Sequence, residues 1–497
     1  MSVDLFRVQP FRPPAPVPPG RRLGFIQLLR VLARNPLECW SQDFFSEKIA
    51  RVGLPIGQAF VVNDPAAIRH VLIDNASNYR KDPIQRRVLS AGLADGLLSA
   101  EGERWDIQRR TLAPLFSLRN VRSLTANMLQ AVDQLSRRWL ALPPGSVVDV
   151  VAEMTLLTLN VLALTIFSDG LQGDLDEFRG SMNDYFRAAG RIGLLDLVGA
   201  PDFVPRPGGR KLKATLGYFQ GVIDALIETR QSECRKNPSD QRCDLLSLLL
   251  GALDPATGRA MSPAEVRSNI LTFLSAGHET TANTLSWSLY LLSQSDAWRA
   301  AVEAEAGEKL AGPPDTLFDR LTVTRAVVEE ALRLYPPISA LSRLAQGPDR
   351  LGCHDIKARA LIVISPYVLH RHVSLWDQPD LFDPSRFLPE SRRTIERFAY
   401  LPFGAGPRTC IGSTFALQEA TIALATLVDR FSIALAAGAK VWPVMSVTLR
   451  PGAGLPMRIT PKSNVEDVGR DCLPGVTGEP LPAALPRRIS GRGTSRS

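Results

Sequence analysis

The stretch Phe403–Gly412, with the sequence FGAGPRTCIG, places three glycines and one proline around a single cysteine, Cys410. The segment that follows has the spacing of one buried helix face, formed by Leu417, Leu424, Val428 and Phe431. Cys410 is therefore expected at a helix N-terminus, where unpaired N–H groups and the helix dipole favour a deprotonated sulfur. Glycine lacks a Cβ, so a bulky flat ligand can approach the loop backbone. This arrangement indicates ligation of iron by sulfur.

Two other interpretations of the stretch are a buried cysteine in a glycine-rich turn and a dinucleotide-binding loop built on Gly404 and Gly406. The dinucleotide pattern fails at its third glycine, where Thr409 stands.

The stretch resembles the cysteine-ligand loop of the cytochrome P-450 superfamily, whose pattern it matches at Phe403, Gly404, Gly406, Arg408, Cys410 and Gly412. The resemblance extends from about Pro36 to Pro461. It implies a mainly α fold with small β-sheets, in which one large helical-prism domain carries a small β-rich subdomain. It also implies haem b, iron protoporphyrin IX, bound by Cys410 and contacted by Phe403, Gly404 and Gly412, with O₂ as co-substrate.

The longest predicted helix runs from Ser262 to about Ser293 and begins with a serine cap, a proline in the first turn and Glu265 at the capping-box position. In the middle of this helix, one face carries an aromatic residue together with small and hydroxyl residues: Phe273, Ala276, Gly277, Thr280 and Thr284. The Thr280 hydroxyl can bond to the carbonyl of Ala276 and bend the helix, which would leave room for a diatomic molecule and water.

In the superfamily that the chain resembles, the positions of Glu279 and Thr280 form an acid and alcohol pair that relays protons to bound oxygen, and Ala276 and Gly277 lie beside the cofactor. Taken alone, the motif has a less favoured alternative interpretation, a polar, solvent-facing stripe on the helix. His278 is assigned to structure or pocket lining rather than to a metal.

Glu330 and Arg333 lie three residues apart on a predicted helix that ends near Tyr335, so they share a face and can pair. An isolated ion pair of this kind is common on protein surfaces and contributes little to folding stability. By resemblance, Arg386 in Pro384-Ser385-Arg386-Phe387 is the third member of a network that locks the cysteine loop.

Trp105 and Arg109 share one helical face and resemble the element that bonds to a haem propionate in the superfamily; Arg343 and Arg408 are further candidates. The planar guanidinium fork suits carboxylates. A nearby cluster of arginines could present a positive surface to an acidic electron carrier: Arg104, Arg110, Arg119 and Arg122.

The 497-residue chain has a net charge of +8, which is compatible with nucleic acid, anionic lipid or an acidic protein as partner. Its six cysteines lack disulfide or metal-finger spacing, so a reducing cytoplasm is expected. No apolar run reaches the length of about 20 residues that spans a bilayer. The amphipathic segment from Leu23 to Ala33 predicts a helix that packs on the body, with a membrane-surface contact as the alternative.

Residues 1–20 are expected to form a proline-rich leader outside the core, residues 21–461 the catalytic domain, and residues 462–497 a disordered basic tail. Short strands are expected at Ala59–Val62, Leu361–Ile364, Ser446–Leu449 and Pro456–Ile459, with a helix at Ala66–Leu72.

The resemblance implies a soluble, bacterial-type monooxygenase, expected to be monomeric and to bind no nucleic acid. Its electrons would come from NAD(P)H through a separate ferredoxin or flavodoxin with its reductase. An apolar substrate of fatty-acid, terpenoid or steroid type is expected from the candidate lining segments Leu97–Leu98, Leu194–Val198 and Ile338–Leu341. The alternatives are a haem-thiolate isomerase or peroxygenase that needs no electron donor, and a non-enzymatic haem sensor or carrier.

Overall fold

The structure, a computed structural model, describes residues 11–53, 57–82, 85, 96–168, 180–181, 209–236 and 244–463. The helices of these residues are α1 (Phe25–Arg34), α2 (Pro65–Arg69), α4 (Gly102–Leu112), α5 (Leu118–Ser123), α6 (Thr125–Leu140), α7 (Val150–Phe167), α10 (Gly209–Lys236), α11 (Leu245–Leu250), α12 (Pro263–Ser293), α13 (Asp296–Lys309), α14 (Leu317–Arg320), α15 (Thr322–Leu334), α16 (Pro366–Leu369), α17 (Pro389–Arg392) and α18 (Ser413–Arg430). Short 3₁₀ or π turns are η2 (Pro36–Cys39), η3 (Gln42–Phe45), η4 (His70–Asp74), η5 (Ala76–Asn78), η6 (Ala113–Phe116), η7 (Pro314–Thr316) and η8 (Pro384–Phe387).

The strands of the described residues are short and form four small sheets. The largest has the order β1-β2-β8-β5-β3, made by Ile49–Val52, Ala59–Val62, Leu361–Ile364, Leu341–Ala345 and Tyr79–Arg80. Only β2 and β8 in this sheet run parallel, with Phe60 opposite Ile362. The others are β4-β12-β9 (Ser146–Asp149, Pro456–Pro461, Phe431–Leu435), β10-β11 (Pro443–Met445, Leu449–Pro451) and β6-β7 (Asp349–Leu351, His354–Ile356).

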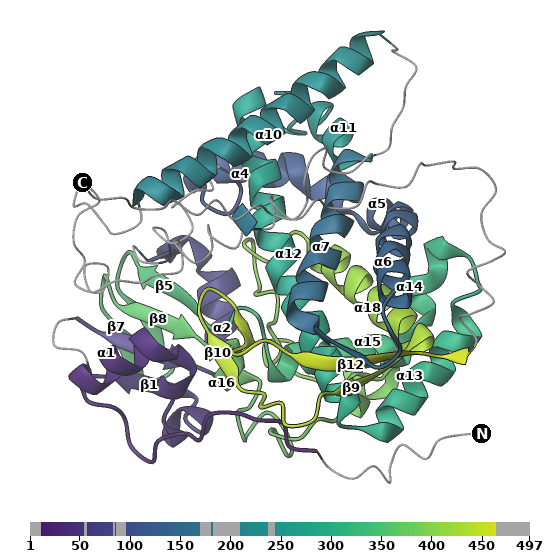
Figure 1. Ribbon diagram of the computed structural model, residues 1–497. Helices are drawn as coiled ribbons and strands as arrows, with labels where there is room; N and C mark the ends of the chain where they lie inside the picture. The colour runs from purple at the N-terminus through teal and green to yellow at the C-terminus, as the bar shows by residue number, and fades with distance from the viewer. Residues whose placement is uncertain are drawn as a thin grey trace, which may run out of the picture. The chain divides into compact units, whose positions relative to one another are not determined.

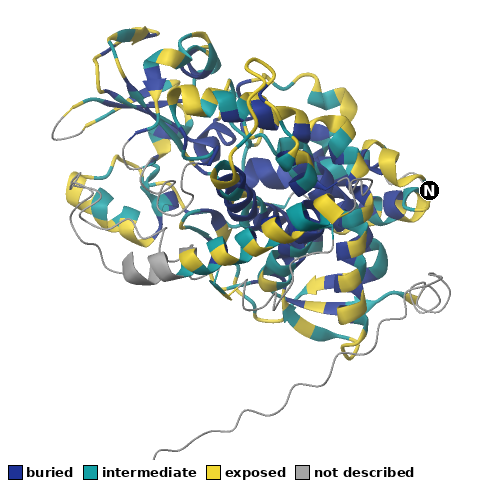
Figure 2. Ribbon diagram, turned by 90° about the horizontal axis from the view of Figure 1, so that it is seen from above, coloured by how far each residue is buried: buried dark blue, intermediate teal, exposed yellow. Residues whose placement is uncertain are grey.

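The helix α12 organises the core. It packs on α7, α15 and α18, and Figure 1 shows α6, α7, α12 and α18 beside one another, away from the sheet that contains β1, β5 and β8. Figure 2 shows the buried residues concentrated in these central helices. The predicted capping box is present, because Ser262 Oγ accepts from the Glu265 N–H at 3.3 Å and Glu265 Oε2 accepts from the Ser262 N–H at 2.8 Å. The mainly α fold with small sheets is confirmed.

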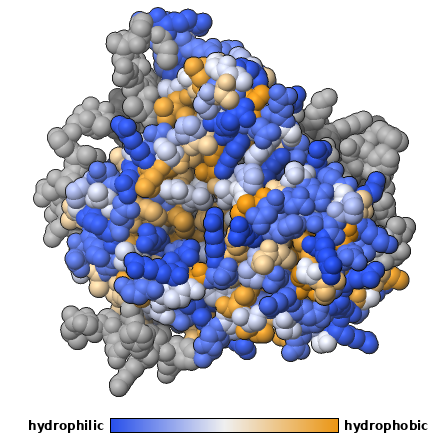
Figure 3. All heavy atoms as spheres, turned by 180° about the vertical axis from the view of Figure 1, so that it is seen from behind, coloured by the Kyte–Doolittle hydropathy of each residue, from blue (hydrophilic) through white to orange (hydrophobic). Residues whose placement is uncertain are grey.

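One described helix, α7, is long and apolar enough to cross a membrane by length and composition. Most of α7 is buried, and it packs between α6 and α12, as expected for a core helix. The face in Figure 3 is mostly hydrophilic, with apolar residues gathered in a band near its middle.

Several predicted boundaries differ from the structure. Phe431 does not belong to the buried face of α18; it begins β9, where the alternating burial of Phe431 and Ile433 is that of a strand paired with β12. Of the strand expected at Ser446–Leu449, only Leu449 lies in a strand, where β11 begins. Residues 446–448 form the turn between β10 and β11. The expected helix at Ala66–Leu72 is α2, which changes at His70 into the π turn η4.

The proline-rich segment contacts the core. This differs from the prediction that residues 1–20 lie outside it. Phe11 packs against the core, and the Pro14 carbonyl accepts a hydrogen bond from Tyr335 Oη at 2.8 Å. The described residues up to Pro461 form one compact unit. The assignment of leader, catalytic domain and tail stays a prediction.

Candidate active site

The loop that carries Cys410 is closed by its own backbone and leads directly into α18. The Cys410 N–H donates to the Phe403 carbonyl at 2.9 Å, and the Thr409 N–H donates to the Gly406 carbonyl at 3.0 Å. Gly412 is the N-cap of α18, so the predicted position of Cys410 at a helix N-terminus is observed. The main chain of this ten-residue stretch thus fixes where the sulfur lies.

Glycine is required at one position of this loop by space as well as by conformation. Gly406 has a φ of +75°, and a Cβ there would lie 1.9 Å from the Leu72 carbonyl oxygen. Gly404 also has a positive φ, +69°, and its Cβ position lies 3.7 Å from Leu341 Cδ1. Leu341, a predicted lining residue, is therefore next to the cysteine loop.

The thiol of Cys410 is accessible, yet the surrounding chain desolvates it, so the residue lies in a recess. Desolvation raises the pKa of Cys410, while the Gly412 N–H and the nearby Arg109 charge oppose this effect. The Gly412 N–H at the start of the helix thus acts on the Cys410 pKa in the predicted direction, but desolvation is the larger effect. A metal cation bound to the sulfur would reverse the balance, since coordinating thiols lose their proton.

Trp105 and Arg408 form the wall beside this recess. The Arg408 guanidinium lies over the Trp105 ring, 4.0 Å from its centroid, and donates to the Ala100 carbonyl and to Glu101 Oε2, both at 2.9 Å. Arg109, on the same helix as Trp105, interacts electrostatically with Cys410, so both of these α4 residues are near the cysteine loop. Burial lowers the pKa of Arg109 and of Arg408.

Two charged residues that the sequence analysis missed complete the wall. Lys81 Nζ lies 3.3 Å from Glu101 Oε1, and burial, followed by the charge of Arg408, lowers the pKa of Lys81 to about 8. Arg343 is buried in β5 and is close enough to Arg408 and Glu101 for their charges to act on its pKa, which burial lowers. A carboxylate, Glu101, thus lies among Lys81, Arg343 and Arg408. No spacing in the sequence distinguishes Lys81 or Glu101 from an ordinary surface residue.

The middle of α12 contains the predicted hydroxyl bond. Thr280 Oγ1 donates to the Ala276 carbonyl at 2.8 Å, and Ala276 is exposed although most residues around it on α12 are buried. The helix continues through this bond from Pro263 to Ser293, so the expected bend stays a prediction. Gly277 serves packing, since a Cβ there would lie 3.1 Å from Leu162 Cδ1 on α7.

Glu279 projects toward the turn between β10 and β11 rather than toward bulk water. Its Oε1 accepts from Thr448 Oγ1 at 2.8 Å, and Thr448 Oγ1 in turn accepts from Asn283 Nδ2 at 3.0 Å. Oε2 is buried and has no hydrogen-bond partner among the described residues. Burial raises the pKa of Glu279, although the Thr448 bond and the charge of Arg450 oppose the rise. The alternative of a solvent-facing stripe is thus wrong for Glu279.

His278 is buried, and its Nδ1 lies 2.8 Å from the Leu274 carbonyl. Burial lowers the pKa of His278 to about 4, so this histidine is neutral at neutral pH. These observations fit the predicted structural role.

Glu330, Arg333 and Arg386 meet as predicted. Arg333 Nε and Nη2 donate to the two oxygens of Glu330 at 2.6 and 2.7 Å, and both side chains are fully buried. Arg386 Nε lies 3.8 Å from Glu330 Oε1. Burial raises the pKa of Glu330, and the charge of Arg333 opposes the rise.

Arg333 connects this cluster to the segment that precedes the cysteine loop. Its Nη1 donates to the His370 carbonyl at 2.8 Å and to the Pro379 carbonyl at 2.6 Å. The His370 ring accepts from the Leu401 N–H at 2.8 Å through Nε2, so its proton is on Nδ1, which lies 3.2 Å from the Arg333 carbonyl. The His370 ring therefore connects Arg333 on α15 to Leu401, which lies two residues before Phe403. This role of His370 could not be inferred from the sequence.

The sequence pattern of the family described as Cytochrome P450 matches residues 14–456. The chain belongs to the cytochrome P450 family. Cyclooctatin synthase of Streptomyces melanosporofaciens is 31% identical over 92% of this chain and 99% of its own length. Cyclooctat-9-en-7-ol 5-monooxygenase of the same organism is 31% identical over 85% and 91%. The crystal structure of the cytochrome P450DA heme domain has a TM-score of 0.78 at 26% identity and covers 92% of this chain and 100% of that chain.

This P450 is accordingly a haem-dependent monooxygenase that uses O₂. The residues present fit the cofactor: an exposed cysteine lies two residues before the N-cap of α18, and the neighbouring basic wall already binds one carboxylate, Glu101, as it would bind haem propionates.

The segment between Gly96 and Glu101 joins α12 to the cysteine loop. The Leu97 N–H donates to Asn269 Oδ1 on α12 at 2.9 Å, while the Ala100 carbonyl accepts from Arg408. Of the predicted lining residues, Leu97 is buried and Leu98, Ile338 and Leu341 are partly exposed. Leu194–Val198 lies outside the described residues.

The predicted positive surface for an electron carrier is weaker than expected. Arg110 bonds to Asp254 at 3.0 and 3.1 Å, and Arg122 pairs with Asp319. These ion pairs reduce the unpaired charge that the cluster can offer.

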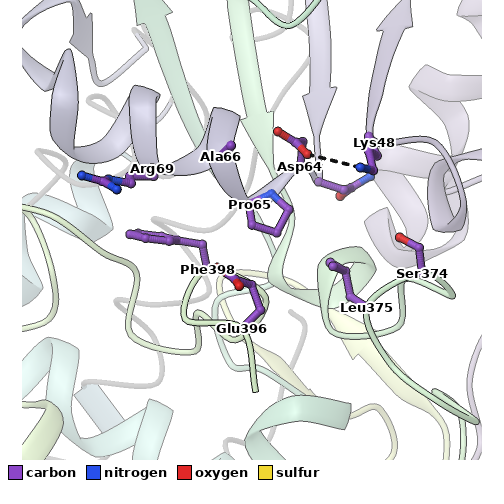
Figure 4. A pocket seen from close by; sticks show the side chains of 10 residues that line it. Lys48, Asp64, Pro65, Ala66, Arg69, Ser374, Leu375, Glu396 and Phe398 are labelled. Atoms are coloured by element: carbon purple, nitrogen blue, oxygen red, sulfur yellow. Dashed lines mark ion pairs between the residues drawn. The ribbon is translucent and has the colours of Figure 1, made fainter. Parts of the chain in front are cut away.

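A separate groove of about 610 Å³ lies at the start of α2. Figure 4 shows Phe398 and Pro65 facing each other across it, with the Lys48–Asp64 ion pair of 3.9 Å at one side. It is lined by Lys48, Asn63, Asp64, Pro65, Ala66, Arg69, Ser374, Leu375, Glu396 and Phe398. None of the predicted cofactor residues lines it, so it does not belong to the site.

Proposed function

We propose that this P450 hydroxylates or epoxidises an apolar compound of terpenoid type, with electrons from a separate redox partner. The observation that carries the proposal is the accessible Cys410 at the start of α18, beside a wall of cations that already binds a carboxylate. The substrate class is supported by the relative named for cyclooctat-9-en-7-ol and by the apolar residues Leu97 and Leu341.

In this proposal Cys410 binds the iron of haem b, and Phe403, Gly404, Gly412, Ala276 and Gly277 contact the cofactor. When bound, the haem supplies oxygen binding and one-electron chemistry, and a thiolate ligand favours cleavage of the O–O bond in cytochromes P450 generally. Trp105, Arg109, Arg343 and Arg408 hold the propionates, and we include Lys81 in this set because it pairs with Glu101 beside Arg408. Guanidinium and ammonium groups pair with carboxylates by charge-assisted hydrogen bonds.

Glu279 and Thr280 deliver protons. Because burial raises the pKa of Glu279, its carboxyl can hold a proton nearer to neutral pH than an exposed glutamate. The unpartnered Oε2 is the atom that can bind a water or pass a proton, while Thr448 holds Oε1. Thr280 Oγ1, bonded to the Ala276 carbonyl, is the hydroxyl that positions the proton at the oxygen site. Glu330, Arg333 and Arg386 keep the cysteine loop in place.

The remaining parts of the proposal concern partners and setting. Electrons come from NAD(P)H through a ferredoxin or flavodoxin and its reductase. The protein is a cytoplasmic monomer that binds no nucleic acid, with a catalytic domain at residues 21–461 between the leader and the tail.

The test reconstitutes the haem-loaded protein with a ferredoxin, its reductase and NADPH. A panel of terpenoid, steroid and fatty-acid compounds is first screened for substrate-induced shifts of the haem spectrum, and each hit is then turned over. The proposal predicts oxygenated product only when reductase, NADPH and O₂ are all present. Product formed with hydrogen peroxide alone, or by isomerisation without an electron donor, would favour the isomerase or peroxygenase class. Spectral binding with no turnover of any hit would favour a sensor.

A further inference from the structure

A serine and a histidine form a hydrogen-bonded pair at the edge of the groove beside α2. Ser374 is exposed and lines this groove, and its Oγ lies 2.9 Å from Nδ1 of His372. His372 is buried, and its other ring nitrogen, Nε2, lies 3.2 Å from the Glu47 carbonyl oxygen. A hydroxyl bonded to an imidazole that is itself oriented by a third group is the arrangement of a serine nucleophile and its general base.

The contacts of the His372 ring determine which of its nitrogens carries the proton. A carbonyl oxygen can only accept a hydrogen bond, so Nε2 donates to Glu47 and Nδ1 keeps a lone pair that accepts from the Ser374 hydroxyl. Burial lowers the pKa of His372, the Glu47 carbonyl opposes this effect, and the charge of Lys48 lowers the pKa further. The ring is therefore neutral at neutral pH and can take up the serine proton.

The groove has room and apolar side chains for an acyl group. Its volume of about 610 Å³ is within the range of small-molecule sites. Figure 4 shows Ser374 at one side of the groove and the Phe398 ring at the other, and Leu375 and Pro65 also line it. An apolar acyl chain can therefore lie against these side chains with its carbonyl carbon at Ser374 Oγ.

Lys48 supplies a positive charge beside the serine and the histidine. Figure 4 shows Lys48 on the same side of the groove as Ser374, and its charge acts on the His372 ring. The Lys48 side chain is 70% exposed, and its ion pair with Asp64 is long, at 3.9 Å, so the ammonium group can turn toward a ligand without losing a strong contact. Attack of a serine on a carbonyl group places negative charge on the carbonyl oxygen, which a nearby cation stabilises.

We propose that Ser374, His372 and Lys48 form a second catalytic site, which hydrolyses carboxylic esters with an apolar acyl group. Ser374 Oγ attacks the carbonyl carbon and gives its proton to His372 Nδ1. The bond from the acyl carbon to the alcohol oxygen then breaks, and the alcohol leaves with that proton. Water attacks the acyl-serine, one of its protons passes through Nδ1 to the Ser374 oxygen, and the carboxylic acid is released. This reaction consumes no electrons, so it does not rest on the proposed function.

A purely structural role is the alternative for this pair. The Ser374 N–H also lies close to Nδ1, at 3.4 Å, so the histidine could serve only to close the turn between the two residues. In that case the Ser374 hydroxyl has the reactivity of an ordinary exposed serine. The neutral, oriented ring and the position of Ser374 in the groove favour catalysis, and the reactivity of the hydroxyl decides between the two roles.

The test uses the haem-loaded full chain without reductase or NADPH. A fluorophosphonate, which esterifies activated serines and releases fluoride, should label the chain, and mass spectrometry of the peptides should place the label on Ser374. The fluorogenic ester 4-methylumbelliferyl butanoate should be hydrolysed faster than in buffer. Ser374→Ala should abolish the label, and Ser374→Ala and His372→Gln should each lower the rate of ester hydrolysis by about 100-fold or more. Lys48→Met should lower it by about tenfold or more.

The matched control is Ser123→Ala. Ser123 is also exposed, but its hydroxyl donates to the Asn120 carbonyl and not to a histidine, so this variant should keep the label and the hydrolysis rate of the wild type. Circular dichroism and the haem spectrum of every variant should match those of the wild type.

Three results would overturn the proposal: no label on Ser374, no hydrolysis above the buffer rate, or equal hydrolysis by the wild type and Ser374→Ala. An unlabelled wild type together with a loss of folding stability in Ser374→Ala would assign the pair to closure of the turn. None of these readouts needs an electron donor, so the ester site can fail while the proposed function stands.

Discussion

Replacing Glu330 by glutamine tests the buried network that supports the cysteine loop. Glutamine keeps the shape of the side chain but removes its charge, so Arg333 remains buried without its bidentate partner at 2.6 and 2.7 Å. Both side chains have no exposed area, so solvent cannot replace the lost pairing. Removing one member of a buried ion pair typically costs about 3 to 5 kcal/mol of folding stability. We expect a loss in this range and a lower yield of haem-loaded protein.

The neighbouring residue provides the control. Glu329 lies on the same helix, and its side chain is 9% exposed, but its partner Arg392, at 3.1 Å, is 41% exposed, so solvent can still hydrate Arg392 when the pair is lost. Glu329→Gln should therefore cost less than about 1 kcal/mol. Urea denaturation followed by circular dichroism gives the free energy of unfolding for both variants. Equal losses for Glu330→Gln and Glu329→Gln would refute the argument that burial makes this network strong.

Three further predictions concern single contacts. Gly406→Ala should destabilise the protein by about 3 kcal/mol or more and reduce haem content, because its φ of +75° and the Leu72 carbonyl at 1.9 Å leave no place for a Cβ, whereas Gly53→Ala, outside the cysteine loop, should be tolerated, since a Cβ there meets nothing within 4 Å; equal haem content in the two variants would contradict this. Thr448→Val should uncouple NADPH use from product and raise peroxide release, while Thr448→Ser, which keeps the hydroxyl on Glu279, should not; unchanged coupling in the valine variant would remove Thr448 from the relay. Burial alone would raise the pKa of Asp349, but hydrogen bonds from Tyr79, the Arg350 N–H, His70 and Asn75 outweigh it and lower this pKa to about 2. This stabilisation, about 1 kcal/mol after screening by solvent, is present above about pH 4 and is lost as the pH falls toward 2, so Asp349→Asn should flatten the acid limb of the unfolding curve by that amount, and an unchanged limb would contradict the assignment.

Features carried by local spacing could be predicted from the sequence. The cysteine loop, the capping box of α12 and the bond from Thr280 to Ala276 each depend on residues within a few positions of one another. The meeting of Glu330 with Arg386 is a longer-range contact, and it was predicted only because the chain resembles a family with that network.

Contacts between distant single residues could not be predicted in this way. Glu101 is 307 residues from Arg408, and Thr448 is 169 residues from Glu279, so neither pair leaves a periodic trace in the sequence. The desolvation that acts on the Cys410 pKa could not be predicted for a related reason. Helix position can be inferred from sequence, whereas the desolvation that dominates this pKa depends on the packing of the whole loop.

The central claim is that the sulfur of Cys410 is the protein ligand of the haem iron. The most direct measurement is the absorption spectrum of the reduced, CO-bound protein for wild type, Cys410→Ser and Cys353→Ser, the last being an exposed cysteine away from the loop. Ligation of the iron by Cys410 predicts the red-shifted Soret band of thiolate ligation in the wild type and in Cys353→Ser, and its loss in Cys410→Ser. Persistence of that band in Cys410→Ser would show that a different atom binds the iron.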